Sequence, residues 1–278
     1  MKLKHYNPIK FLIGIWAILI SIIKFLFAKI FFSVPRRIDQ SLKKSNCIIS
    51  TVEFKNNSKF ENIVKEISTL FNNLENTDSF VTVLNNKFVK GFVSNGSAYY
   101  LVNKALPLKS IIEVIENSIL FDTLQKHFGC QFYCRNVSVF KTSPNPNGTT
   151  STYFHRDGHP PFNFKILIYL SDVIDIDYGP TSILKSTSKF VIPGWGRYTY
   201  DRPYSDNLYR SNVVLGNAGT AVLFDTNTLH AGGRTKRGER IIMTVQLAPK
   251  FSNSINSFIS SSTIEAGSRE YDLKIPLF

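Results

Sequence analysis

Hydrophobic residues follow three different patterns along this chain of 278 residues. Between positions 11 and 32 they form an almost unbroken run. Within 58–76, apolar residues recur at helical spacing behind a capping box made by Ser58 and Glu61, which predicts an amphipathic helix. Beyond position 130 they fall in short β-rich runs separated by Pro, Gly and Asn turns.

The remaining elements follow from the same reading. Turn signals separate three short strands early in the chain, and a second helix is expected to end at Gly129. We expect strands at 80–84, 88–93, 98–102, 131–141, 164–170, 211–214, 220–224 and 240–247, with the second helix at 107–127. Helices followed by many short strands are typical of a β barrel or a double-sheet jelly roll with helices outside it.

The run from 11 to 32 is long enough to cross a membrane. At 1.5 Å per residue it extends about 33 Å, against a hydrocarbon core of roughly 30 Å. Lys24 lies past its middle and opposes insertion by about 2.5 to 3.5 kcal/mol, which snorkelling reduces. We expect a single-pass helix, with an interfacial helix or hairpin as the alternative. A cleaved signal peptide fits less well, because Arg36 and Arg37 follow and no small-residue cleavage site is present.

The basic charge of the chain is concentrated around this run. The formal net charge is +13, and residues 1–44 contribute nine Lys and Arg against one Asp. Cations that flank an apolar segment indicate a membrane surface rather than nucleic acid. More of them follow the run than precede it, which predicts a cytoplasmic C-terminal domain. The three cysteines match neither a disulfide framework nor a zinc pattern.

Three residues in the β-rich half could hold a metal. His155 and Asp157 form a His-x-Asp pair, and residues i and i+2 of an extended chain point to one face. His230 follows a second strand and turn. Two histidines and one carboxylate make the facial triad that suits non-haem Fe(II) and leaves coordination positions open.

An arginine opens the last predicted strand. Arg240, Ile242, Thr244 and Gln246 would share one face of that strand, since side chains alternate. An arginine among polar neighbours fits a cavity wall, where its guanidinium grips a carboxylate through two parallel hydrogen bonds. Arg135 and Tyr153 are candidates to face a substrate.

The order of these motifs resembles the phytanoyl-CoA dioxygenase-like branch of the Fe(II)/2-oxoglutarate-dependent oxygenases. The motifs are HRD at 155–157, IYLSD at 168–172, GPT at 179–181, GTAVLFDTNTLHAGG at 219–233, and Arg240. The resemblance covers residues 131–250 and implies a mainly β, double-stranded β-helix (jelly roll, cupin-like) with flanking helices. It also implies Fe(II) bound by His155, Asp157 and His230, and Arg240 on the distal carboxylate of 2-oxoglutarate. Lys165 and Tyr169 are candidate secondary co-substrate contacts. Where the family usually has Gly-Ser-His after GPT, this chain has Lys185, Ser186 and Thr187.

These expectations divide the chain into a membrane anchor with basic flanks (1–45), an oxygenase domain (46–250, jelly-roll core 131–250) and a Ser-rich tail (251–278). The expected function is a membrane-anchored dioxygenase that uses molecular oxygen to hydroxylate a small-molecule or lipid-like substrate, with release of succinate and CO2. Two alternatives remain. A prolyl-hydroxylase-like membrane oxygenase usually has lysine at the position of Arg240, and a non-catalytic membrane-attached β-barrel binding module would not need iron.

Overall fold

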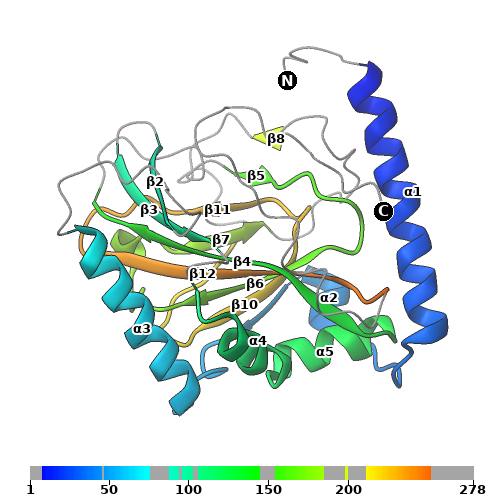
Figure 1. The fold of residues 1–278 in the computed structure, drawn as a ribbon, viewed down its shortest axis with the longest axis horizontal. Helices are drawn as coiled ribbons and strands as arrows, with labels where there is room; N and C mark the ends of the chain where they lie inside the picture. The colour runs from blue at the N-terminus through cyan, green and yellow to red at the C-terminus, as the bar shows by residue number, and fades with distance from the viewer. Residues whose placement is uncertain are drawn as a thin grey trace.

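Two antiparallel sheets form the body of the protein, and helices cover the outer face of the larger sheet (Figure 1). The computed structural model describes residues 8–45, 47–75, 88–93, 96–102, 106–144, 154–184, 198–199 and 211–251. The helices are α1 (Pro8–Phe31), α2 (Gln40–Ser45), α3 (Ser58–Glu75), α4 (Leu108–Glu116) and α5 (Ile119–Phe128), with a short 3-10 turn, η3, at Ile176–Tyr178.

The early strands all belong to the larger sheet, and the later strands are divided between the two sheets. The larger sheet has the order β1 (Cys47–Ser50), β10 (Ala221–Asp225), β6 (Phe164–Tyr169), β12 (Arg240–Pro249), β4 (Phe132–Thr142), β3 (Gly96–Val102) and β2 (Phe88–Val93). The smaller sheet has the order β8 (Tyr198–Thr199), β5 (His155–Arg156), β11 (His230–Gly232), β7 (Thr181–Leu184) and β9 (Ser211–Val213). The prediction of a mainly β fold with flanking helices is confirmed.

Each face of the larger sheet buries its own set of side chains. On β12, Met243, Val245 and Leu247 join the core that the sheet shares with α3, α4 and α5. Ile242 packs instead against the cluster between the two sheets, where Tyr169 and Phe224 are fully buried. The period-2 pattern of this strand therefore separates a helix-facing side from a side that faces the smaller sheet.

The structure confirms most of the predicted elements in the described residues and corrects one. The helix from Ser58 is present, and so is the left-handed cap at Gly129, with φ of 70°. The helix expected at 107–127 is two helices, because Ser118 adopts an extended backbone and its Oγ accepts a hydrogen bond from the Phe121 amide. The strand expected at 80–84 and residues 252–278 of the tail lie outside the described residues.

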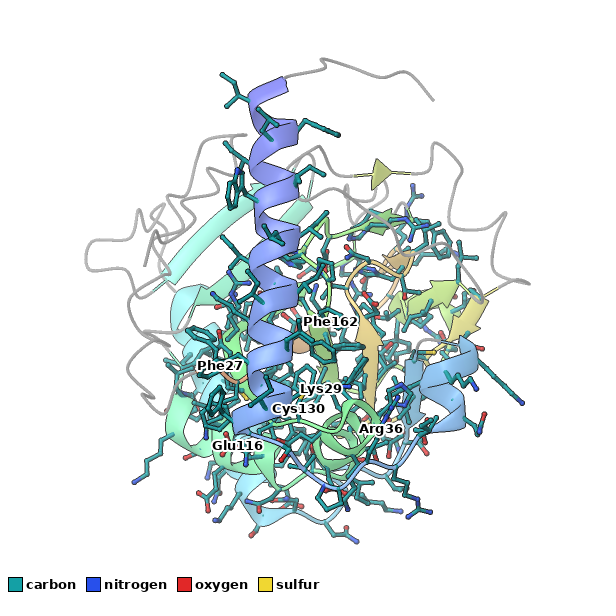
Figure 2. All side chains as sticks on the ribbon, turned by 90° about the vertical axis from the view of Figure 1, so that its right-hand side faces the viewer. Phe27, Lys29, Arg36, Glu116, Cys130 and Phe162 are labelled. Carbon is teal, nitrogen blue, oxygen red and sulfur yellow. The ribbon has the colours of Figure 1, made fainter. Side chains whose placement is uncertain are left out.

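Helix α1 packs against the domain along one face. Ser21 Oγ donates to the Pro161 carbonyl at 2.6 Å, and the Phe25 ring stacks on Phe162 with centroids 3.9 Å apart. Ala28 is fully buried in the main core. Figure 1 shows α1 along one side of the molecule, and Figure 2 shows Phe162 beside its lower half. These contacts fix the C-terminal half of α1 to the domain.

The opposite face of α1 exposes large apolar side chains. Trp16 is 62% exposed and Ile30 is 71% exposed. Among the described residues, Phe11–Phe31 is the one helical segment long and apolar enough to cross a membrane. The helix is thus apolar on both faces, of which only one is covered by the protein.

The chain after α1 is joined to the domain through its backbone. Ser33 forms a β-bridge with Cys130, and the Gln131 amide donates to the Phe32 carbonyl at 2.8 Å. Leu42 on α2 is buried in the main core. Core residues therefore lie on both sides of the domain boundary expected at residue 45, and that boundary stays a prediction.

Candidate metal centre

The His-x-Asp pair and the distal histidine come together between the sheets. His155 on β5 is the direct cross-strand partner of His230 on β11, and their rings lie 4.4 Å apart. Asp157 Oδ1 is 3.8 Å from His155 Nε2 and 3.6 Å from His230 Nε2. One ligand atom from each residue lies within 4.8 Å of the others, so a single metal ion can contact all three.

Backbone contacts orient the His230 imidazole and Asp157 toward each other. His230 Nδ1 lies 2.9 Å from the Thr228 carbonyl, which assigns the proton to Nδ1 and leaves Nε2 free to bind a metal. The Asp157 amide donates to the Thr226 carbonyl at 3.1 Å. The turn that precedes His230 therefore positions both the imidazole and the aspartate.

Lys165 contacts the carboxylate from the side away from the histidines. Its Nζ lies 2.6 Å from Asp157 Oδ2, while Oδ1 faces the two imidazoles. Burial alone would raise the pKa of Asp157, but the Lys165 ammonium and the nearby histidines hold that pKa well below its usual range. Asp157 is therefore ionised, as a metal ligand must be. Sequence reasoning missed this ion pair, and the co-substrate contact suggested for Lys165 stays a prediction.

Arg240 lies beside the strand that carries His230. Its guanidinium is buried and donates to the Gly179 carbonyl. A Cβ on Gly232 would stand 3.2 Å from Arg240 Nη2, so the glycine makes room for the guanidinium two residues beyond His230. The structure thus places the Arg240 guanidinium against β11, the strand that carries the third triad member.

Tyr169 lies deeper between the sheets. Its hydroxyl donates to the Val214 carbonyl at 2.8 Å and accepts from the Thr181 amide at 2.9 Å. Burial raises its pKa. These bonds link β6 to the smaller sheet, and a co-substrate contact at Tyr169 stays a prediction.

A polar network that the sequence did not reveal borders the triad. His159 Nε2 lies 3.3 Å from Gln246 Nε2, and Asn227 donates its side-chain amide to the His159 carbonyl at 2.9 Å. Burial lowers the pKa of His159 to about 4, which keeps its ring neutral. Asn163 donates to the Pro160 carbonyl at 2.8 Å and closes the turn that leads back to β6. In the sequence, only the Asn in the turn before His230 could have indicated this network.

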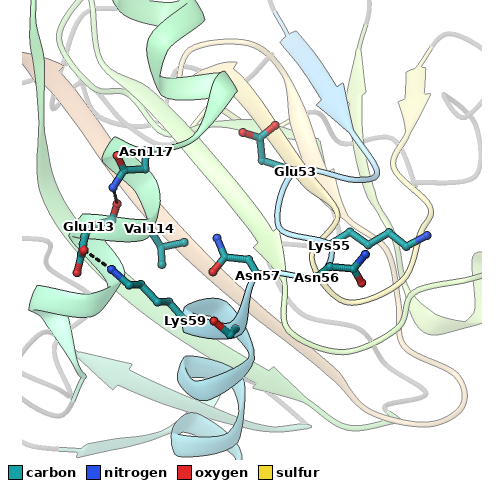
Figure 3. A pocket seen from close by; sticks show the side chains of 9 residues that line it. Glu53, Lys55, Asn56, Asn57, Lys59, Glu113, Val114 and Asn117 are labelled. Carbon is teal, nitrogen blue, oxygen red and sulfur yellow. Dashed lines mark hydrogen bonds and ion pairs between the residues drawn. The ribbon is translucent and has the colours of Figure 1, made fainter.

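A separate surface pocket lies in the helix layer (Figure 3). It encloses about 510 Å³ beside the start of α3, where Lys59 pairs with Glu113 of α4. None of the predicted site residues lines it. The triad lies across the larger sheet from this pocket, so the pocket has no part in the metal centre.

In sequence, the chain matches no family model and no curated protein. Similar solved structures do exist. The iron-bound structure of EctD from S. alaskensis has a TM-score of 0.54 at 13% identity, over 78% of this chain and 80% of that one. SnoN, a non-heme alpha ketoglutarate dependent epimerase from nogalamycin biosynthesis, has a TM-score of 0.52 at 12% identity, over 74% and 80%.

SnoK, a non-heme alpha ketoglutarate dependent carbocyclase from the same biosynthesis, has a TM-score of 0.50 at 13% identity, over 77% of this chain and 87% of that one. At such identities the similarity shows a shared fold. The two-sheet body of this protein is thus the fold on which these three enzymes are built.

Proposed function

We propose that this protein is an Fe(II)- and 2-oxoglutarate-dependent oxygenase, built on a double-stranded β-helix, that hydroxylates a small-molecule or lipid-like substrate. The observation that carries the proposal is the meeting of His155, Asp157 and His230, with their ligand atoms within 4.8 Å of one another, between two antiparallel sheets. The names of the neighbours SnoN and SnoK add the kind of co-substrate, and EctD was solved with bound iron.

The donor set fits iron. Two imidazoles and an ionised carboxylate suit Fe(II) and would leave positions open for other ligands. Bound iron, with 2-oxoglutarate and molecular oxygen, supplies the oxidising chemistry, which yields succinate, CO2 and a hydroxylated product. The protein's own residues hold this geometry, with Lys165 fixing the free oxygen of Asp157 and Thr228 fixing the His230 ring.

Arg240 fits the distal carboxylate of 2-oxoglutarate. A buried guanidinium presents a planar fork, and Gly232 leaves space beside it. We keep Lys165 and Tyr169 as candidate secondary contacts. Lys165 is the better placed, because its ammonium reaches a triad residue.

Helix α1 is proposed to hold the enzyme at a membrane, with its exposed apolar face in the lipid. The contacts of Ser21, Phe25 and Ala28 with the domain favour a helix that lies along the membrane surface, since a helix bound to a folded domain over half its length cannot be surrounded by lipid there. The single-pass span and the cytoplasmic orientation stay predictions.

The test is turnover by the detergent-solubilised full chain with Fe(II), ascorbate and 2-oxoglutarate, followed as succinate in the presence of lipid extracts. We expect succinate to form and to require iron, and we expect His155→Ala, Asp157→Ala and His230→Ala each to lose iron and activity without unfolding. Iron bound stoichiometrically by wild type, but equally by all three variants, would remove the proposed site. Absence of both iron binding and turnover would favour the non-catalytic binding module.

A further inference from the structure

Two cations lie on neighbouring elements where α1 passes β12 and β4, which pair with each other. Lys24 on α1 places its ammonium 4.2 Å from the centre of the Phe251 ring. The Phe251 ring in turn lies 5.8 Å from the ring of Tyr133 on β4, with the two planes 73° apart. Arg135 follows Tyr133 by two residues on β4, and its guanidinium reaches Asn163. Asn163 comes directly after Phe162, whose ring stacks on Phe25 of α1. The anchor helix therefore contributes a cation to a corner that β4 also makes positive.

A β-bulge aims Arg135 into this corner. Gln246 of β12 pairs with Asn136 and Leu247 pairs with Cys134, so Arg135 is the extra residue of β4. Cys134 belongs to the helix-side core, whereas Arg135 Nη1 lies 3.4 Å from Asn163 Oδ1 in the turn that follows the triad aspartate. Arg135 thus stands between α1 and the metal centre.

Neither cation has a carboxylate partner among the described residues. Arg135 has a neutral amide beside it, and Lys24 has an aromatic ring. By contrast, Lys141 and Lys165, which are less exposed than Lys24, pair with Glu239 and Asp157. Two like charges gathered without a counter-charge attract an anion, and the guanidinium fork suits an oxyanion.

We propose that Lys24 and Arg135 bind the oxyanion headgroup, a phosphate or carboxylate, of an amphiphilic ligand whose apolar part lies along α1. The apolar side chains of α1 are contiguous with Lys24, so a headgroup held here keeps its chain beside the helix. The identification of this ligand as the substrate rests on the proposed function. Its binding at this corner does not depend on that function.

The experiment uses the full chain in neutral detergent micelles and three probes: hexyl phosphate, inorganic phosphate and hexanol. Binding is measured by titration calorimetry. We expect hexyl phosphate to bind at one site, more tightly than either other probe. Arg135→Gln and Lys24→Gln should each weaken it at least about tenfold, the loss of one charge-assisted bond, and Arg135→Lys should restore part of the affinity. The matched control is Lys43→Gln, an exposed cation on α2, and it should bind as wild type does.

Other results would overturn the proposal. Equal affinity of inorganic phosphate would mean that a free anion, and not an amphiphile, is the ligand. Hexyl phosphate binding that survives both glutamine variants would remove the site altogether. Iron content is measured on the same samples: a wild type that binds hexyl phosphate but neither iron nor 2-oxoglutarate would defeat the proposed function and leave this site standing. Unfolding temperatures near that of wild type identify variants that are folded.

Discussion

At the scale of single residues, the two oxygens of Asp157 have separate tasks. Oδ1 faces both triad histidines, and Oδ2 accepts from Lys165. Because the lysine compensates the carboxylate charge, Asp157 can stay ionised in this buried site while Oδ1 faces the histidines. The triad itself could be predicted from sequence, since a His-x-Asp pair has its own spacing. The lysine could not, because an ion pair eight residues apart depends on where the intervening turn places the strand.

Arg240 gives a prediction at the same scale. Arg240→Lys should raise the Kd for 2-oxoglutarate by roughly 10- to 150-fold and leave iron binding intact, because an ammonium cannot replace both hydrogen bonds of a guanidinium fork, a loss of about 1.5 to 3 kcal/mol. Anaerobic titration of 2-oxoglutarate into the Fe(II) protein measures this through the absorption of the chelate. The control is Arg234→Lys, which should behave as wild type. Arg234 is exposed in the loop that connects β11 to β12. An unchanged midpoint for the Arg240 variant would place the co-substrate elsewhere.

At the scale of elements, the long strands and amphipathic helices were predictable and the short strands were not. On β12, Thr244 and Gln246 alternate with Met243, Val245 and Leu247, so the two faces of the strand can be identified from sequence. By contrast, β5, β7 and β11 have two to four residues each, too few to show a period. Their positions come from pairing, as in the register of His155 with His230. The metal centre lies on such short strands. The sequence therefore predicted its ligands but did not predict the strands that hold them.

The packing of α1 against the domain gives a prediction at the scale of elements. Phe25→Ala should lower the free energy of unfolding by about 1 to 2 kcal/mol, since it removes a partly buried aromatic side chain and its stack on Phe162. Phe162 has φ of 62°, a strained value for an aromatic residue, and this stack helps to hold it. Ile30→Ala, on the exposed face, is the control and should leave stability in detergent unchanged while weakening association with vesicles. Denaturant unfolding and vesicle flotation measure the two effects, and equal loss of stability in both variants would contradict this arrangement.

At the scale of the whole molecule, the segment between the anchor and the domain is part of the fold. Arg37 donates its amide to the Lys126 carbonyl at 2.8 Å, and the Asp39 amide donates to His127 Nδ1. A sequence boundary was expected at residue 45 because the charge pattern ends there. Charge does not report burial, however, and Leu42 within that segment is 4% exposed.

Truncation tests this integration. A chain that starts at residue 46 loses Leu42, whose burial is worth about 2 to 3 kcal/mol, and one kilocalorie shifts Tm by about 2 to 4 °C at this size. We therefore expect Tm at least about 4 °C below that of a chain starting at Ser33, which keeps the segment. Thermal unfolding of the two chains side by side decides the matter. Equal midpoints would mean that residues 33–45 only connect the helix to the domain.

The alkylation rate of Cys130 can report how often α1 detaches from the domain. Cys130 is fully buried and pairs with Ser33 at the foot of the helix, close to Lys29 and Arg36 in Figure 2. Burial raises its pKa to about 11, so the docked protein presents a protonated thiol that alkylating agents cannot reach. Cys134 is buried within β4 and needs the core itself to open. The alkylation rate of Cys130 relative to Cys134 therefore measures how often the helix leaves the domain while the rest of the protein stays folded.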